Sequence, residues 1–160
     1  MQQGNDDGQA RLELGGFHKL APGVTDSLRA IGGAVKRSGL DERLVELVKI
    51  RASQINGCAF CLQMHATAAR KLGETEDRLQ LLCVWHEAPV FSARERAALA
   101  WTEALTRITE GHVSQEVYDQ ARTSFSEEEL AHLTGAIVTI NAWNRIAVAY
   151  RFTPEVRPQP

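Results

Sequence analysis

Residues 41–65 read DERLVELVKIRASQINGCAFCLQMH, and this stretch decides the fold class. Apolar residues recur at spacings of three and four over residues 44–52, which is the period of an α-helix and not of a strand. Asp41 stands where its side chain can cap the first turn of that helix. The Asn56-Gly57 pair then breaks the helix, and another is expected to begin near Cys58. The stretch therefore predicts two consecutive helices.

The helical period continues through the rest of the chain, and no alternating strand pattern competes with it. Ser92 with Glu95, and Ser126 with Glu129, form the pattern of a capping box at the start of two later helices. Gly and Pro fall mostly between the periodic segments, so no internal domain boundary is expected. The sequence predicts a single all-α bundle of about six or seven helices over residues 10–152, between a flexible N-terminus (residues 1–9) and a flexible C-terminal tail (residues 153–160).

The last predicted helix has apolar residues on most of its circumference between residues 130 and 148. A helix that is apolar all round must be covered on all sides by protein. A central position in the bundle would provide such cover, and so would a second subunit, which we favour. The sequence therefore predicts a buried C-terminal helix and a homo-oligomer.

The 160-residue chain has a formal charge of −2, with 18 basic and 20 acidic side chains. This near balance provides no strong field that would attract nucleic acid or an anionic membrane surface. Residues 1–9 lack the basic start and the apolar run of a secretory signal, and no uninterrupted apolar stretch reaches the ~20 residues of a membrane-spanning helix. We expect a cytoplasmic protein that binds neither nucleic acid nor membrane.

Cys58, Cys61 and His65 stand at positions i, i+3 and i+7 of the helix that follows the break. This spacing places all three on one helix face, within an arc of roughly 60°. Cysteines one turn apart can meet the Cα separation of ~4.4–6.8 Å that a disulfide requires. Because structural disulfides are rare in a reducing compartment, the pair indicates redox chemistry or metal binding.

Thiolate formation needs assistance, because a free thiol has a pKa of about 8.5 and the thiolate is the nucleophile. The helix N-terminus beside Cys58 favours the anion, and His65 can accept the proton of Cys61 near neutral pH. If the two helices fold back antiparallel about the break, Glu46 lies close to His65 and can orient the imidazole or exchange a proton with it. Cys61, Cys58, His65 and Glu46 are therefore the candidate catalytic residues.

Two other kinds of site use such a cysteine pair. Zinc could be held by the two thiolates, His65 and Glu46, although structural zinc usually draws its ligands from two separated loops. A thioredoxin site requires a strand before the Cys-x-x-Cys motif, whereas residues 44–55 have a helical pattern. Redox chemistry remains the favoured interpretation, and it requires neither a cofactor nor a metal.

Other chemistry-bearing residues are expected to serve the structure. Cys83 lies on the apolar face of a helix predicted between Thr75 and Pro89, so it is expected to be a small buried apolar residue. Arg51 and Arg145 are expected to hold carboxylates in the core rather than to bind an anionic substrate.

Glu46 followed by Cys58-x-x-Cys61-x-x-x-His65 resembles the AhpD-like alkylhydroperoxidase branch of the carboxymuconolactone decarboxylase family. Residues 47–58 (LVKIRASQINGC) and 141–146 (NAWNRI) are also similar to this family, and the resemblance covers roughly residues 40–152. It implies an all-α fold that assembles as trimers or hexamers. One departure is Phe60, which stands within the motif where the best-known peroxidases of the family carry a histidine.

The resemblance also implies a dithiol cycle. Cys61 would attack a peroxide and become a sulfenic acid, Cys58 would resolve it to a disulfide, and Glu46 and His65 would relay protons. The substrate would be a peroxide or a small disulfide, and the reductant a thiol, which in the best-known members belongs to a lipoylated protein. Phe60 implies weaker peroxidase activity or another substrate. The alternatives are a non-catalytic redox-sensing or metal-binding helical module, and a lactone decarboxylase of the family's other branch, which would give the cysteines no role.

Overall fold

The structure, a computed structural model, describes residues 9–156, and this part of the chain is a single helical domain without strands. The predicted all-α class is confirmed, with eight α-helices in the described part where six or seven were expected. Most of the expected flexible N-terminus and the end of the expected tail, residues 1–8 and 157–160, lie outside the described residues. The elements are α1 (Leu14–Leu20), α2 (Pro22–Arg37), α3 (Glu42–Ile55), α4 (Ala59–Lys71), α5 (Glu76–Leu81), a 3₁₀ turn (Leu82–Val84), α6 (Ala93–Thr106), α7 (Gln115–Ser124) and α8 (Glu127–Tyr150).

The helices begin at the capping residues that the sequence indicates. Asp41 Oδ1 accepts hydrogen bonds from two backbone N–H groups in the first turn of α3, at 2.8 and 3.4 Å. Both predicted capping boxes form, Ser92 with Glu95 at the start of α6 and Ser126 with Glu129 at the start of α8. These side chains satisfy backbone donors that a helix leaves unpaired at its start, so the local sequence fixes where α3, α6 and α8 begin.

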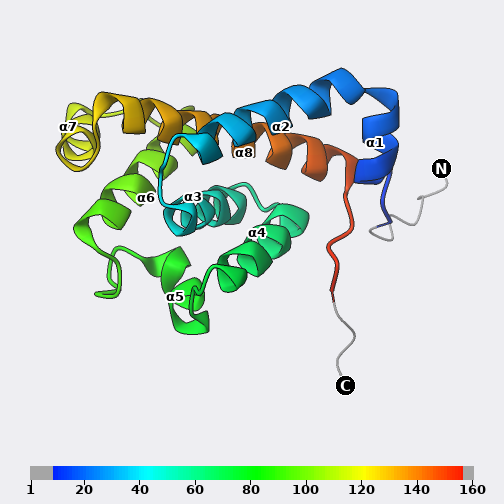
Figure 1. Ribbon diagram of the computed structural model, residues 1–160. Coiled ribbons are helices and arrows are strands. Elements are labelled where there is room, and N and C mark those ends of the chain that lie inside the picture. The colour runs from blue at the N-terminus through cyan, green and yellow to red at the C-terminus, as the bar shows by residue number, and fades with distance from the viewer. Residues whose placement is uncertain (1–8, 157–160) are drawn as a thin grey trace.

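α3 lies at the centre of the domain, below the paired α2 and α8 and beside α4 (Figure 1). α6 packs against both α3 and α8, and α7 contacts α6 and α8 at the far end of the bundle. Because α3 contacts three other long helices, most of its residues are buried, including the charged Glu46 and Arg51. A carboxylate as deeply buried as that of Glu46 needs hydrogen-bond or ionic partners to offset the loss of its hydration.

The expected burial of Cys83 is wrong, because the segment that carries it is not α-helical throughout. α5 ends at Leu81, and a 3₁₀ turn follows. A repeat of three residues per turn buries Leu79, Leu82 and Trp85 together and leaves Cys83 exposed. Cys83 is therefore an accessible free thiol on the opposite side of this segment from the core.

α8 is the longest helix, with 24 residues, and the other helices leave part of its apolar surface uncovered. Leu133, Ile137 and Ile140 are at most 2% exposed, whereas Val138 is 58% and Val148 is 49% exposed. Within residues 9–156, neither α8 nor any other helix has the length and apolar character to cross a membrane. The single chain therefore buries part of the C-terminal helix and leaves apolar residues such as Val138 and Val148 uncovered.

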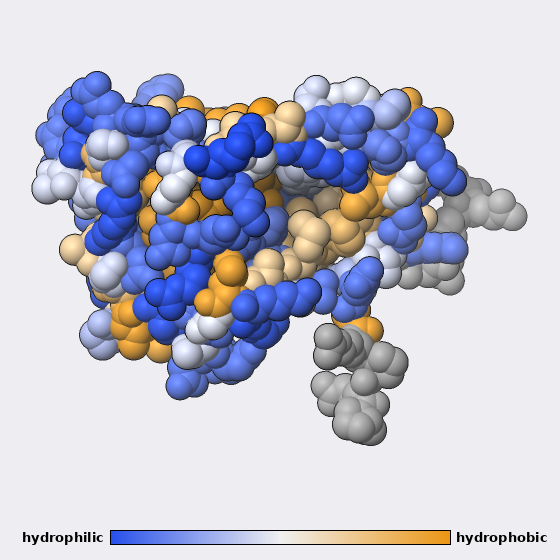
Figure 2. All heavy atoms as spheres, viewed as in Figure 1, coloured by the Kyte–Doolittle hydropathy of each residue, from blue (hydrophilic) through white to orange (hydrophobic). Residues whose placement is uncertain are grey.

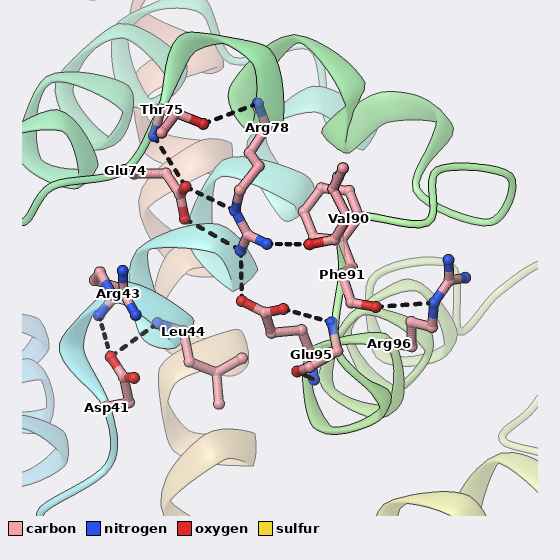
Figure 3. Close-up of polar contacts among 11 residues, drawn as sticks. Asp41, Arg43, Leu44, Glu74, Thr75, Arg78, Val90, Phe91, Glu95 and Arg96 are labelled. Carbon is pink, nitrogen blue, oxygen red and sulfur yellow. Dashed lines mark hydrogen bonds and ion pairs between the residues drawn. The ribbon is translucent and has the colours of Figure 1, made fainter.

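Arg78 of α5 binds to three neighbouring segments of the chain (Figure 3). Its guanidinium donates to Glu74 Oε1 at 2.8 Å, to Glu95 Oε1 and to the backbone carbonyl of Val90. The side chain of Glu74 is 3% exposed and that of Glu95 is 21% exposed. Two largely buried carboxylates thus share one cation.

Arg51 has the expected structural role and Arg145 does not. Arg51 Nε donates to Glu103 Oε1 at 2.7 Å, and Trp85 Nε1 donates to the same oxygen at 2.8 Å. Arg145 donates instead to the carbonyl and the side chain of Asn141, at 2.9 and 3.0 Å. The partner of Arg145 is therefore the amide of Asn141, one turn earlier on α8, and not the carboxylate that the sequence predicts.

Candidate active site

The cysteine motif begins at the turn between α3 and α4. Gly57 adopts φ 66°, in the left-handed region that favours glycine, and the backbone N–H of Cys58 donates to the carbonyl of Ser53 at 3.0 Å. Cys58 is the N-cap residue of α4, and its Sγ accepts a hydrogen bond from the backbone N–H of Cys61 at 3.3 Å. Sulfur thus takes the place that a serine, threonine or aspartate oxygen usually has at a helix start.

The two thiols differ in how readily they lose a proton. A hydrogen bond from the Cys61 thiol lowers the pKa of Cys58 to about 7, against the opposing effect of burial, with smaller contributions from the Cys61 backbone N–H and the Asn144 side chain. The same thiol–thiol hydrogen bond, together with burial, raises the pKa of Cys61. Both residues are free cysteines with at most 2% exposure. Loss of a proton from the pair is therefore favoured at Cys58, with the Cys61 thiol as its hydrogen-bond donor.

α3 and α4 fold back on each other, and this hairpin brings Glu46 to His65. His65 Nδ1 lies 2.7 Å from Glu46 Oε2, and the two side chains are 13% and 11% exposed. The contact predicted from the turn is confirmed, while the catalytic role of the two residues stays a prediction.

Glu46 is ionised although it is largely buried. Burial opposes ionisation, but the hydrogen bond and charge of His65 and the ammonium of Lys49 outweigh it and lower the pKa of Glu46. Lys49 Nζ donates to Glu46 Oε1 at 2.8 Å. Because an ionised carboxylate can only accept, Nδ1 of His65 donates to it, and Nε2 is the ring atom that gains or loses a proton.

A cavity of about 500 Å³ opens beside the motif, between α2, α3, α4 and α8. Cys61, His65 and Glu46 all line it, so the predicted acid–base pair and one of the two sulfurs face the same space. Figure 2 shows apolar side chains in the hollow between the upper helices and α4. The apolar part of the wall includes Leu28, Val35, Phe60, Met64, Ile140 and Trp143.

Aromatic rings from three segments cover the dithiol. The ring of Phe60, within the motif, lies 5.5 Å from that of Phe152, which lies 6.4 Å from Phe17 of α1. Phe152 is 4% exposed and belongs to the same buried cluster as both cysteines. Phe60 and Phe152 also line the cavity, so these rings limit the access of water to the sulfurs at its edge.

Sequence reasoning missed one buried polar residue on the face of α8 that packs against the cysteines. Asn144 of α8 has no exposed surface, and its Nδ2 donates to Ser53 Oγ at 3.1 Å. A signal was available, because Asn141 and Asn144 are amides within an otherwise apolar helix, and a buried amide requires specific hydrogen-bond partners.

The arrangement of ligands gives the zinc alternative no support. In the part of the chain that the structure describes, no three His, Cys, Asp or Glu side chains come close enough together to hold a metal ion. A structural zinc site needs four such ligands in a tetrahedron. The two thiols and the His65–Glu46 pair therefore stand as two adjacent pairs and not as one ligand set.

Residues 22–104, just over half of the chain, match the family described as "Carboxymuconolactone decarboxylase family". The chain belongs to this family. Glu46, Cys58, Cys61 and His65 all lie within the matched residues, so the resemblance seen in the motif is confirmed.

Relatives of known sequence and structure agree with this membership. The uncharacterized protein YdfG of Bacillus subtilis is 40% identical over 133 residues, which are 83% of this chain and 90% of that protein. A crystal structure from Agrobacterium tumefaciens, of a protein of unknown function described as a candidate antioxidant defence protein AhpD, is 40% identical with a TM-score of 0.87. It covers 93% of this chain and all of its own.

A more distant protein of the same fold is named as a debrominase. The debrominase Bmp8 superposes with a TM-score of 0.77 at 18% identity, over 86% of this chain and 74% of its own. This likeness shows the fold alone. Since one fold serves different reactions, the activity of this chain has to be argued from its own site.

Proposed function

We propose that this protein is a thiol-dependent oxidoreductase that reduces peroxides or small disulfides with the Cys58–Cys61 dithiol. The observation that carries the proposal is the meeting of two pairs at one cavity. The first is the sulfur pair at the start of α4, in which the pKa of Cys58 is lowered and Cys61 lines the cavity; the second is the buried His65–Glu46 pair. The description of the Agrobacterium relative as a candidate antioxidant defence protein supports it.

The first step is a proton transfer within the sulfur pair. The charge rests on Cys58, but Cys61 is the sulfur that lines the cavity. The Cys61 thiol already donates to Cys58, so transfer of this one proton leaves a thiolate on Cys61, facing the substrate. The cost of this transfer is smaller than that of removing a proton to solvent, since the net charge of the pair is unchanged.

The second step breaks the peroxide bond. The Cys61 thiolate attacks the terminal oxygen of a hydroperoxide, a sulfur–oxygen bond forms, and the oxygen–oxygen bond breaks. The leaving alkoxide takes the proton of His65 Nε2 and departs as an alcohol, while Glu46 holds the imidazole in position through Nδ1. Cys61 is left as a sulfenic acid, oxidised by two electrons.

The third step closes the disulfide. Cys58 attacks the Cys61 sulfur, the sulfur–sulfur bond forms, and hydroxide leaves with the Cys58 thiol proton as water. A small disulfide as substrate would follow the same course with a thiol as the leaving group. An external dithiol, such as that of a lipoylated protein, would return the pair to its reduced state, and the cytoplasm would supply it.

The cavity favours organic substrates over hydrogen peroxide. Its wall is mostly apolar, and Phe60 stands beside Cys61 where a polar residue would favour a small hydrophilic peroxide. Burial of an apolar substituent contributes roughly 25 cal/mol per Å² of surface removed from water. We therefore expect an aryl or alkyl hydroperoxide to be reduced faster than hydrogen peroxide.

The test is peroxide consumption with an excess of a small dithiol as reductant. Cys61→Ser should abolish turnover, and Cys58→Ser should stop after one equivalent with a sulfenic acid or mixed disulfide on Cys61. Cys83→Ser is the matched control, because it removes an exposed thiol outside the site and should leave turnover unchanged. Equal peroxide consumption by the parent, Cys61→Ser and Cys58→Ser would exclude the proposal, and a parent that oxidises once without turnover would favour a redox sensor.

A further inference from the structure

Asn144 lies between α8 and the cysteine motif. It is fully buried, and its neighbours on the same face of α8, Ile140 and Ala147, are 2% and 3% exposed. Both neighbours belong to the buried cluster that contains Cys58 and Cys61. The face of α8 that covers the dithiol is thus apolar except for one amide.

The hydrogen bonds around Asn144 fix which way its amide points. Ser53 Oγ donates its only hydrogen to the carbonyl of Lys49 at 2.8 Å, so toward Asn144 it can only accept. Asn144 Nδ2 is therefore the donor in its 3.1 Å contact with Ser53 Oγ. On the other side, Asn56 Nδ2 donates to Asn144 Oδ1 at 2.9 Å. The oxygen is occupied, and one N–H of Nδ2 remains for the sulfurs.

The remaining N–H is buried beside the cluster that holds both cysteines, so it is the donor available to them. After the larger effect of the Cys61 thiol, a hydrogen bond from the Asn144 side chain is among the contacts that lower the pKa of Cys58. For Cys61, whose pKa the bond to Cys58 and burial raise, the Asn144 hydrogen bond acts in the opposite direction. One neutral donor thus favours a negative charge on either sulfur.

We propose that Asn144 is the anion-stabilising residue of the dithiol, and that its side-chain N–H follows the negative charge from Cys58 to Cys61 during the reaction. A neutral donor suits this task, because a fixed cation would hold the charge on the nearer sulfur. The inference rests on the proposed function only for its consequence in turnover, since the charge on the thiols can be measured without substrate.

The experiment is an ultraviolet titration of the thiolate in a Cys83→Ser background, which removes the absorbance of the exposed cysteine. Asn144→Leu is close in size and strands no buried donor, because Asn56 Nδ2 keeps its bond to Asn141 Oδ1 and Ser53 keeps its bond to Lys49. The thiolate midpoint should rise by about one pH unit, and the thiolate fraction at pH 7 should fall about fivefold.

The matched control is Asn141→Leu. This change removes an amide one turn earlier on α8, which bonds to Thr106 and Asn56 and not to the cysteines. It should leave the thiolate midpoint unchanged even if it lowers stability. Should Asn144→Leu not fold, Asn144→Ala applies the same test, and the Asn144 side-chain amide resonances of the parent should shift with a midpoint of about 7.

An unchanged midpoint in a folded Asn144 variant, or amide resonances that do not move with pH, would overturn the inference. A raised midpoint in a protein without peroxide or disulfide turnover would uphold the role of Asn144 and refute the proposed function. The two proposals can therefore fail separately.

Discussion

His65 Nδ1 and Glu46 Oε2 lie 2.7 Å apart although the residues are nineteen positions apart on two different helices. The α3–α4 hairpin creates this contact, and the hairpin depends on Gly57, whose φ of 66° reverses the chain. The pair is largely buried, so the carboxylate acts on the imidazole with little screening by water. Its effect on proton transfer should therefore be measurable.

Glu46→Gln should slow peroxide reduction by roughly 10- to 100-fold, because the amide no longer stabilises the protonated imidazole that delivers a proton to the leaving group. The measurement is the initial rate at saturating dithiol as a function of pH. A rate and pH profile equal to those of the parent would remove Glu46 from the mechanism.

The stability of the protein gives an independent check on the same residue. The pKa of Glu46 is lowered in the folded protein, so its contribution to stability is present above the ordinary carboxyl value and is lost as pH falls through the lowered one. Urea unfolding of the parent should show this loss in acid. In Glu46→Gln the loss should be smaller, because the titrating group is absent.

Which cysteine holds the charge can be decided by titration. In a Cys83→Ser background, the thiolate absorbance should rise through a midpoint of about 7, since the deprotonated form of Cys58 is favoured as pH increases past this value. The step should persist in Cys61→Ser, where a hydroxyl can still donate to Cys58, and should disappear in Cys58→Ser. Persistence in Cys58→Ser would assign the low pKa to Cys61.

The hairpin and the Glu46–His65 contact were predictable because their determinants are local. Asp41 caps α3, Asn56-Gly57 ends it, and the number of residues on each side of the turn sets which side chains meet. The same reasoning gave the wrong burial for Cys83. A 3₁₀ turn changes the helical period there from 3.6 to 3 residues, and nothing in the local sequence predicts that change.

Contacts between distant segments could not be read from the sequence. Asn144 meets Ser53 across 91 positions, and only the packing of α8 on α3 brings them together. The sequence also could not predict which of the two cysteines ionises more readily, because this depends on the direction of the hydrogen bond between the Cys58 and Cys61 thiols. α1 has no side-chain cap and contains Gly15-Gly16, so its existence depends on contacts such as that of Phe17 with Tyr150.

Arg78→Met should destabilise the protein by about 2 kcal/mol. It leaves Glu74 and Glu95 without the cation they share, and an uncompensated carboxylate at this depth is costly, although solvent reaching Arg78 reduces the effect. Chemical denaturation measures the change. Arg70→Met is the matched control, because Arg70 pairs with Glu76 at the surface and should change stability little. Equal losses in the two variants would contradict this interpretation of Figure 3.

The uncovered apolar residues of α8 should lie in an interface with a second copy of the chain. Val138 is 58% and Val148 is 49% exposed, and exposed apolar side chains on so apolar a helix favour burial in a homo-oligomer, as the sequence predicts. Light scattering at micromolar concentration should give a mass of several chains, and Val138→Lys should lower it. Gln120→Lys, on the exposed side of α7, should not. A monomeric parent would rule out the assembly.

Because a sulfur atom caps α4, oxidation changes how that helix starts. A disulfide sulfur is neutral and a weak acceptor, so the backbone N–H of Cys61 loses the charged partner that it has in the reduced protein. The first turn of α4, which carries Phe60, should then fray, and amide hydrogen exchange at Cys61 should be faster after oxidation. Fraying here would lift Phe60 away from Phe152 and admit an incoming reductant to a pair that is otherwise shielded. Oxidation of the dithiol would thereby make the disulfide more accessible to the reductant that restores it.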